Sequence, residues 1–229
     1  MKLQRKLYWL LLVALALLSP AAYANPAQAP TFKAIPPGSK VVLMPIDVEL
    51  FSISAGGVFE PQAEWTSQAM ENLKGAFHNR QHKNAIAFSE FPDGPDEAIE
   101  SLNRLHGAVG EAINLHYFGP LNLPTKESRL EWTLGPDVSA IRQKTGADYA
   151  LFTFMRDSYA SGERVATMVV AAMFGVGLPG GAQVGYVSLV DLSTGDILWF
   201  NRLIRGTGDL RNTGAAKESL DALLDNFPD

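Results

Sequence analysis

The sequence of 229 residues contains no cysteine. This absence excludes disulfide bonds, catalysis by a thiol and the acylated cysteine of a bacterial lipoprotein. A chain without disulfides has to be stabilised by an ordinary hydrophobic core, and hydrophobic residues make up 47% of this one. The composition is therefore that of a globular protein that needs no covalent cross-links.

Positive charge is also scarce. The sequence has 19 Lys and Arg against 24 Asp and Glu, which gives a formal net charge of -5 at pH 7. Proteins that bind nucleic acid neutralise phosphates with clustered Lys and Arg, and no such cluster occurs here. We therefore predict that nucleic acid is not a partner.

The first 24 residues have the pattern of an export signal. Lys2, Arg5 and Lys6 precede an uncharged, leucine-rich run over residues 7–18, and Ala22-Tyr23-Ala24 is a small-x-small cleavage site. The run is shorter than the roughly 20 residues that span a bilayer. We expect residues 1–24 to be a signal peptide cleaved after Ala24, which predicts a periplasmic protein.

The mature chain is expected to hold one domain. Removing the signal takes away three cations and changes the formal net charge from -5 to -8. Residues 25–39 are rich in Pro and Ala and are interpreted as a tether, and residues 40–229 have a length typical of a single domain.

Hydrophobic patterning predicts alternating strands and helices. Continuous or alternating apolar runs predict strands over residues 41–46, 85–91, 148–154, 184–190 and 197–204. The last two are separated by a turn containing Gly195, as in an antiparallel hairpin. Helical stripes are formed by Trp65, Ala69, Leu73 and Phe77, by Leu102, Leu105, Val109 and Ile113, and by Ala216, Leu220, Leu223, Leu224 and Phe227.

Two further helix signals complete the pattern. Pro136 is expected to open a helix that Gly146 ends, and Thr213 is a candidate cap for the last helix. This order predicts an α/β fold: a single domain with a mixed β-sheet, helices packed against it and an antiparallel hairpin near the C-terminus.

Three stretches of the chain resemble a known family. "KVVLMPID", "TGADYALF" and "GYVSLVDLSTGDILWFNR" are similar to sequences of periplasmic and outer-membrane accessory proteins related to the curli secretion lipoprotein, whose fold is like the amino-terminal domain of TolB. The resemblance implies a mixed α/β domain that acts through protein contacts in the cell envelope, often as an oligomer or an activator. The chain departs from the family in one respect, because it has no cysteine that could be lipidated.

No catalytic, cofactor or metal site is predicted. Ser161 and Ser188 lack the flanking glycines of a nucleophile elbow. His78 and His82 have a spacing that brings two imidazoles to one metal, but no acidic residue completes an HExxH motif, and solvated histidines at a helix end are the better interpretation. His106 is likewise without an acidic neighbour in sequence. We therefore expect the protein not to be an enzyme.

The stretch "AMFGVGLPGG" contains glycines in the spacing of a dinucleotide-binding loop. Gly175, Gly177 and Gly180 follow this spacing, but Pro179 lies between them and a predicted strand follows, whereas a cofactor loop opens a helix. We interpret the glycines as a structural loop and predict no cofactor.

The apolar run over residues 165–178 leaves three interpretations open. It is too short for a transmembrane helix, and it can be core, a surface for a partner or for self-association, or a site of shallow membrane contact. The residues expected to contact another chain are Val169, Val170, Met173 and Phe174.

The function expected from these features is that of a non-enzymatic envelope accessory protein, with an envelope protein or a second copy as its partner. A periplasmic small-molecule or glycan-binding module is the alternative, with Trp132 as the candidate contact residue, since Trp65 and Trp199 fall at positions expected to pack. A hydrolase with an unrecognised site is the second alternative.

Overall fold

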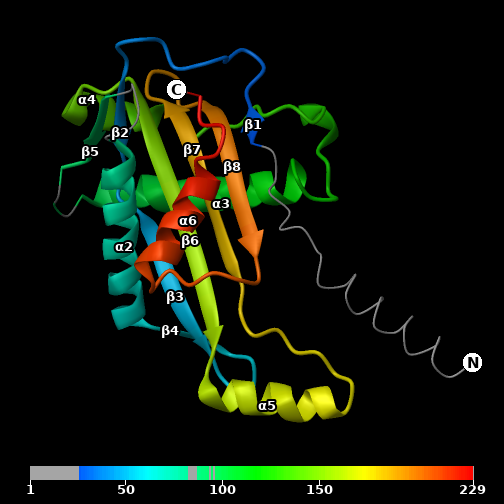
Figure 1. Cartoon of the computed structure of the whole chain (residues 1–229). Coiled ribbons are helices and arrows are strands. Elements are labelled where there is room, and N and C mark those ends of the chain that lie inside the picture. The colour runs from blue at the N-terminus through cyan, green and yellow to red at the C-terminus, as the bar shows by residue number, and fades with distance from the viewer. Residues whose placement is uncertain (1–25, 82–86, 93, 95, 229) are drawn as a thin grey trace, which may run out of the picture.

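The computed structural model describes residues 26–81, 87–92, 94 and 96–228, and the strands among them build one eight-stranded sheet (Figure 1). The strands are β1 (Ala27–Gln28), β2 (Lys40–Leu43), β3 (Asp47–Ile53), β4 (Phe59–Pro61), β5 (Ala87–Glu90), β6 (Tyr149–Ala160), β7 (Gln183–Asp191) and β8 (Ile197–Arg205). The helices are α2 (Ala63–Gln81), α3 (Glu97–His116), α4 (Ser139–Thr145), α5 (Gly162–Met173) and α6 (Thr213–Leu223), with short 3-10 turns η1 (Pro124–Lys126) and η2 (Pro136–Val138).

The sheet lies between two layers of helices. Helices α2 and α6 cover one face, and their apolar stripes form a core with Leu151, Met155 and Trp199 of the sheet. Helices α3 and α4 cover the other face around Phe152, Tyr186 and Phe200. The chain is thus a mixed α/β domain with helices packed on both faces of its sheet, as the hydrophobic patterning predicts.

Strand β6 organises the sheet because it pairs with three other strands. It runs antiparallel to β7 from Tyr149 to Asp157, and on its other edge it is parallel first to β2 and then to β3. The chain leaves this edge between β2 and β3, around Pro45, which has no backbone N–H to donate to a neighbouring strand. The edge of the sheet therefore has a step beside Phe152 and Thr153.

The predicted hairpin and most helices are confirmed. Strands β7 and β8 form the antiparallel hairpin, and Gly195 in its turn has φ +83°. Gly146 ends α4 with φ +66°. The last helix begins at Thr213, but its cap is Asn212, whose side chain accepts from the N–H groups of two residues in the first turn.

Several boundaries differ from the prediction. Strand β2 ends before Pro45, β6 continues to Ala160, and β3 and β4 were not expected at all. Strand β5 occupies the described part of the predicted strand over residues 85–91. The extra strand β3 forms because β6 is long enough to pair with both β2 and β3 along one edge. The hydrophobic pattern of a short segment does not show which distant strand it pairs with.

The buried stripe of α3 is also different from the predicted one. Leu105 is exposed, and His106 is buried in its place, followed by Gly107 and Gly110. The stripe is shifted because the glycines allow Tyr186 of the sheet to approach the helix, and the Tyr186 hydroxyl donates to the Gly107 carbonyl at 2.6 Å.

The described part of the expected tether is packed against the domain. Strand β1 pairs with β8, and both Ala27 and Ile35 are buried. The Ile35 N–H donates to the carbonyl of Pro228 at 3.0 Å, so the segment closes over the C-terminal end of the chain. The predicted signal peptide lies outside the described residues.

Candidate functional site

A helical arm connects the neighbouring antiparallel strands β6 and β7 of the sheet. The arm comprises residues 161–182, with α5 at its outer end, and it connects β6 to β7 (Figure 1). Its two ends are held together by the sheet, since the Ala160 N–H donates to the Gly180 carbonyl at 2.7 Å. The arm therefore takes the place of the turn in the β6–β7 hairpin.

The base of the arm is fixed by specific contacts. The Ser161 side chain accepts from the Arg164 N–H at 3.1 Å and caps α5. The Arg164 guanidinium turns inward and donates to the carbonyls of Ala55 and Pro179. A Cβ at Gly181 would lie 3.0 Å from the carbonyl carbon of Ser158 and closer still to its oxygen, so only glycine fits there.

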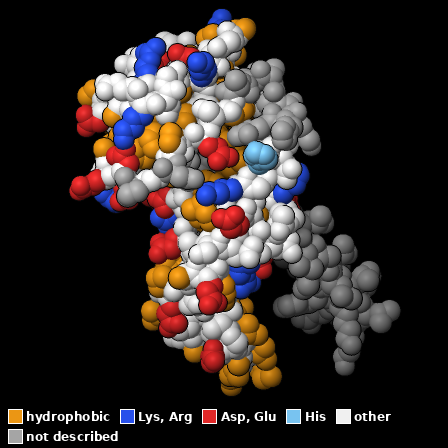
Figure 2. Space-filling model, turned by 90° about the vertical axis from the view of Figure 1, so that its left-hand side faces the viewer, with side chains coloured by type: hydrophobic (Ala, Val, Ile, Leu, Met, Phe, Trp, Pro, Cys, Tyr) orange, Lys and Arg blue, Asp and Glu red, His pale blue; other side chains and the backbone are white. Residues whose placement is uncertain are grey.

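The outward side of α5 is apolar and exposed. We call the side chains on it the arm face. They are Val165 (49% exposed), Val169 (53%), Val170 (55%), Met173 (78%), Phe174 (81%) and Val176 (51%). All four predicted contact residues, Val169, Val170, Met173 and Phe174, are therefore exposed, and the interpretation of this run as core is wrong. Figure 2 shows hydrophobic side chains gathered at this end of the molecule.

The arm face is extended by the turn between β3 and β4. Val58 in this turn is 62% exposed, and Phe59 at the start of β4 is 56% exposed. The turn contacts the start of α5, where the Ser161 N–H donates to the Ile53 carbonyl at 2.9 Å and Arg164 reaches Ala55. Exposed apolar side chains from two separate segments thus share one end of the domain, which is typical of an interaction surface.

The arm carries almost no charge. Residues 165–182 include no Asp, Glu, Lys or Arg, and α5 itself has only Glu163 and the inward-facing Arg164. Helices that lie in a membrane interface usually carry Lys and Arg on their polar side, where they meet anionic headgroups. The described helices also include none long and apolar enough to cross a membrane. The described part of the arm after Arg164 therefore lacks the basic side chains that are typical of such interfacial helices.

The glycines of the dinucleotide-like motif end a helix and do not begin one. Gly175 has φ +76°, and the next N–H, of Val176, donates back to the Ala171 carbonyl at 2.9 Å, as in a Schellman motif. Gly177 and Gly180 follow in the return segment to β7. The N–H groups of a helix start, which would bind a pyrophosphate, are absent from this described segment.

Trp132 lies apart from the arm. Its carbonyl accepts from the Ile197 N–H at the turn of the β7–β8 hairpin, whereas the arm joins the other end of β7. The indole is partly buried, stacks on His116 at 6.4 Å between ring centroids and lies under the Lys126 ammonium at 5.1 Å. The structure does not bring Trp132 together with the arm face, and its role in binding stays a prediction.

A buried histidine and serine form a pair that the sequence analysis missed. His106 Nε2 and Ser188 Oγ are 2.8 Å apart, and both side chains are buried. The imidazole stacks on Phe152, and burial lowers the pKa of His106 to about 3. The pair has the atoms of a base and a nucleophile, but a substrate has no access to it, so it serves as a polar contact within the core.

The histidines offer no metal site in the described residues. His78 is on α2, and His82 lies outside the described residues, so the interpretation of the two as solvated histidines at a helix end stays a prediction. Across the described ranges, no group of three or more His, Asp or Glu side chains is arranged to hold a metal ion.

A buried polar network fastens the C-terminal region to the start of β7. The Gln183 amide donates to the Asp157 carboxylate at 2.8 Å, and Asp157 also accepts from Tyr159 and from the Leu210 N–H. Burial raises the pKa of Asp157, and burial next to that carboxylate raises the pKa of Tyr159. Arg205 completes the network by donating to the Gln183 oxygen at 3.0 Å.

Comparison with known proteins gives distant likenesses only. No protein-family model matches the chain, and no curated protein matches it. Among solved structures, the PelC dodecamer from Paraburkholderia phytofirmans is 12% identical, with 88% of this chain and 96% of that chain covered and a TM-score of 0.36. The LpoB C-terminal domain from Salmonella enterica is 13% identical, with 77% and 87% covered and a TM-score of 0.31.

Lipoprotein GNA1162 from Neisseria meningitidis is also similar, at 13% identity, with 82% of this chain and 94% of that chain covered and a TM-score of 0.34. Likenesses of this strength carry no argument about function. None of these three is a curli secretion protein, and the resemblance to that family stays a prediction.

Proposed function

We propose that this protein is a non-enzymatic component of the cell envelope that acts through protein-protein contact, with the arm face as its contact surface. The observation that supports the proposal most is the exposure of Met173 and Phe174 on an uncharged helix held firmly at its base. Its place in the envelope rests on the predicted signal peptide, residues 1–24. The folded domain is proposed to extend through residues 40–229, with β1 and the segment through Ile35 packed on it.

A second copy of the chain is the partner that we propose. An uncharged apolar surface is complementary to itself, so two copies can place their arm faces together without opposing like charges. This matters because the chain is acidic overall, with a formal net charge of -5, so two copies repel each other at long range and gain from a contact surface that adds no further charge.

The energy available predicts a moderate affinity. Covering the six side chains of the arm face on both copies gives on the order of 10 kcal/mol, at about 1 kcal/mol for each half-exposed side chain. The loss of rotational and translational freedom offsets roughly 4–15 kcal/mol. At the low end of this cost roughly 6–8 kcal/mol remains, so we expect association at protein concentrations of about one to some tens of micromolar.

Sedimentation velocity of the Met173→Asp variant tests the proposal. The wild-type protein is expected to sediment as an oligomer at tens of micromolar, by the affinity argued above. Met173→Asp should sediment as a folded monomer, because association would bury an unpaired carboxylate. Leu105→Asp is the matched control, since Leu105 is 41% exposed on α3, away from the arm, and it should behave as the wild type.

A photocrosslinking residue at position 174 separates self-association from other partners. Crosslinks between two copies support the proposal as stated. Crosslinks to a different envelope protein, with a monomeric wild type, refute the self-association and retain the protein-contact function. Flotation of the protein with lipid vesicles, lost in Met173→Asp and without any protein crosslink, would refute both.

A further inference from the structure

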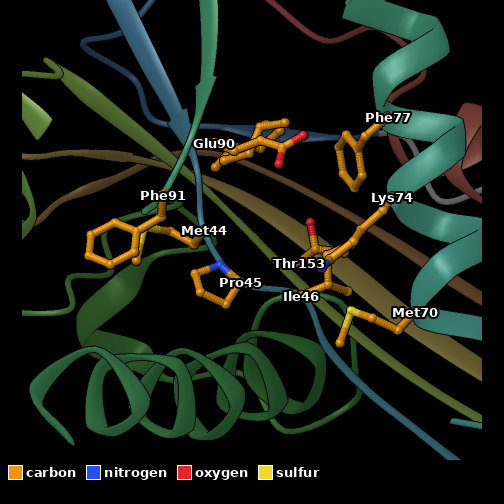
Figure 3. A pocket seen from close by; sticks show the side chains of 11 residues that line it. Met44, Pro45, Ile46, Met70, Lys74, Phe77, Glu90, Phe91 and Thr153 are labelled. Carbon is orange, nitrogen blue, oxygen red and sulfur yellow. The ribbon is translucent and has the colours of Figure 1, made fainter. Parts of the chain in front are cut away.

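A pocket lies at the step in the edge of the sheet. It is enclosed by the segment after β2, the end of β5, helix α2 and strand β6, and it has a volume of about 160 Å³ (Figure 3). Its apolar lining comes from Leu43, Met44, Met70, Phe77, Phe91 and Leu151. This site is separate from the arm and independent of the function proposed for it.

The pocket exists because β2 and β3 do not meet along β6. The register pairs Leu151 with the end of β2 and Phe154 with the start of β3, so among the described residues neither strand pairs with Thr153 on this edge. The segment through Pro45 bows away from β6, and the space beneath it is not filled by another element.

The size of the pocket limits what it can hold. Apolar cavities of about 150 Å³ in other proteins hold a molecule such as benzene. The volume here, about 160 Å³, therefore corresponds to one six-membered ring or a chain of about six carbons. The two methionines in the lining adapt readily to different apolar shapes.

Three polar groups face this apolar space. Thr153 is only 3% exposed, and its hydroxyl has no hydrogen-bond partner within the described part of the chain. Lys74 extends from α2 toward Thr153, and Glu90 points across the opening toward α2 (Figure 3). Neither Lys74 nor Glu90 forms an ion pair with any described residue.

We propose that this pocket binds a small monocarboxylate whose apolar part is a single ring or a chain of about six carbons. The carboxylate accepts hydrogen bonds from the Lys74 ammonium and the Thr153 hydroxyl, and the apolar part lies among Phe77, Phe91 and Met44. Hydrogen bonds from an ammonium to a carboxylate are among the stronger ones, and the Thr153 hydroxyl, which lines the pocket, adds a second donor beside Lys74.

The charge of Glu90 should affect the binding of an anionic ligand in the direction opposite to that of Lys74. Its carboxylate borders the opening and repels the charge of an anionic ligand, so it disfavours dicarboxylates and weakens the binding of a monocarboxylate. Removing the charge of Lys74 and removing that of Glu90 should therefore change the affinity in opposite directions. For an amine ligand both directions would be reversed.

Isothermal titration calorimetry with phenylacetate tests the site. We expect a Kd of about 0.1–1 mM, the range usual for a ligand of this size. Phenethylamine, which has the same ring and a positive charge, should bind at least tenfold more weakly. Lys74→Met should weaken phenylacetate binding about tenfold, Thr153→Val severalfold, and Glu90→Gln should strengthen it severalfold.

The controls distinguish the site from general effects of charge and folding. Lys33→Met makes the same change of charge at an exposed lysine that does not line the pocket, and it should leave the Kd unchanged. Met173→Asp should also leave it unchanged, which separates this proposal from the function of the arm. Urea midpoints of Lys74→Met and Glu90→Gln should match the wild type, because both side chains are exposed.

Three results would overturn the proposal. The first is no heat of binding for phenylacetate or hexanoate at about 5 mM, which is at least roughly five times the expected Kd. The second is tighter binding of phenethylamine than of phenylacetate. The third is a Lys74→Met or Thr153→Val variant that binds phenylacetate as the wild type does.

Discussion

Gly110 on α3 is the position where one added methyl group should do most damage to the core. A Cβ built there would lie 2.7 Å from Cδ2 of Tyr186 and closer still to two other atoms of its ring. Tyr186 is fully buried, stacks on Phe154 at 4.5 Å between centroids and donates to the Gly107 carbonyl at 2.6 Å. The ring therefore has no free space into which it can move.

The expected cost of Gly110→Ala follows from two opposing effects. Replacing a helical glycine by alanine stabilises the helix by roughly 0.5–1 kcal/mol. Overpacking of a filled core costs typically 1–3 kcal/mol, and a strained tyrosine hydrogen bond adds about 1 kcal/mol. We expect a net loss of about 2 kcal/mol in the free energy of unfolding.

Two other helical glycines are matched controls for the urea unfolding measurement. A Cβ on Gly75 of α2 meets nothing within 4 Å, so Gly75→Ala should stabilise the protein by about 0.5–1 kcal/mol. A Cβ on Gly107 meets Phe154 at an ordinary 3.5 Å, so Gly107→Ala should not destabilise the protein and should gain up to about 1 kcal/mol. If Gly110→Ala were as stable as Gly75→Ala, α3 would not lie as close to the sheet as described.

Three further changes have defined outcomes. Gly195→Val should lower the urea midpoint by more than about 1 kcal/mol in free energy, because Gly195 has φ +83° and a Cβ would lie 2.8 Å from the Gly135 carbonyl carbon; an unchanged midpoint would contradict the turn. Asn212→Ala should cost about 1 kcal/mol through loss of the α6 cap, whereas an equal stability would mean that water replaces the cap fully. Burial lowers the pKa of His106 from 6.5 to about 3, so below pH 6.5 the unfolded chain binds a proton that the folded chain does not. The stability from neutral His106 is thus present above pH 6.5 and lost toward pH 3, and the stability advantage of wild type over His106→Gln should shrink by about 2 kcal/mol between pH 7 and pH 5; a constant difference would contradict the burial.

Periodicity in the sequence predicts the elements whose neighbours are local. The β7–β8 hairpin follows from two apolar runs and Gly195, and α2 follows from its stripe of Trp65, Ala69, Leu73 and Phe77. These signals suffice because a hairpin and an amphipathic helix each need only one apolar face and a turn. The mixed sheet with helices packed against it follows from their order.

Features that depend on distant segments were not predictable in the same way. The two strands β2 and β3 look like one interrupted run unless the length of β6 is known, and the pocket beside Thr153 follows from their separation. The burial of His106 was not predicted, because the more hydrophobic Leu105 was assigned to the buried stripe in its place. A signal was nevertheless present, since Gly107 and Gly110 on one helix face indicate a large side chain packing against it.

The exposure of the arm face also needed the structure. From composition alone, the apolar run over residues 165–178 can be part of the core, a site of membrane contact or a surface for a partner. Arg164 decides the orientation, because its guanidinium is held by Ala55 and Pro179 and turns the opposite side of α5 outward.

The arm also changes how the register of β6 against β7 is determined. In an ordinary hairpin a tight turn fixes which residues face each other, but here the whole arm separates the two strands, so the turn contributes no such constraint. A slip by one residue would move Gln183 away from the opposite Asp157 and leave the buried carboxylate without its amide donor. The Asp157–Gln183 pair therefore fixes the register of β6 against β7. The arm can then differ in length and sequence without shifting these two strands.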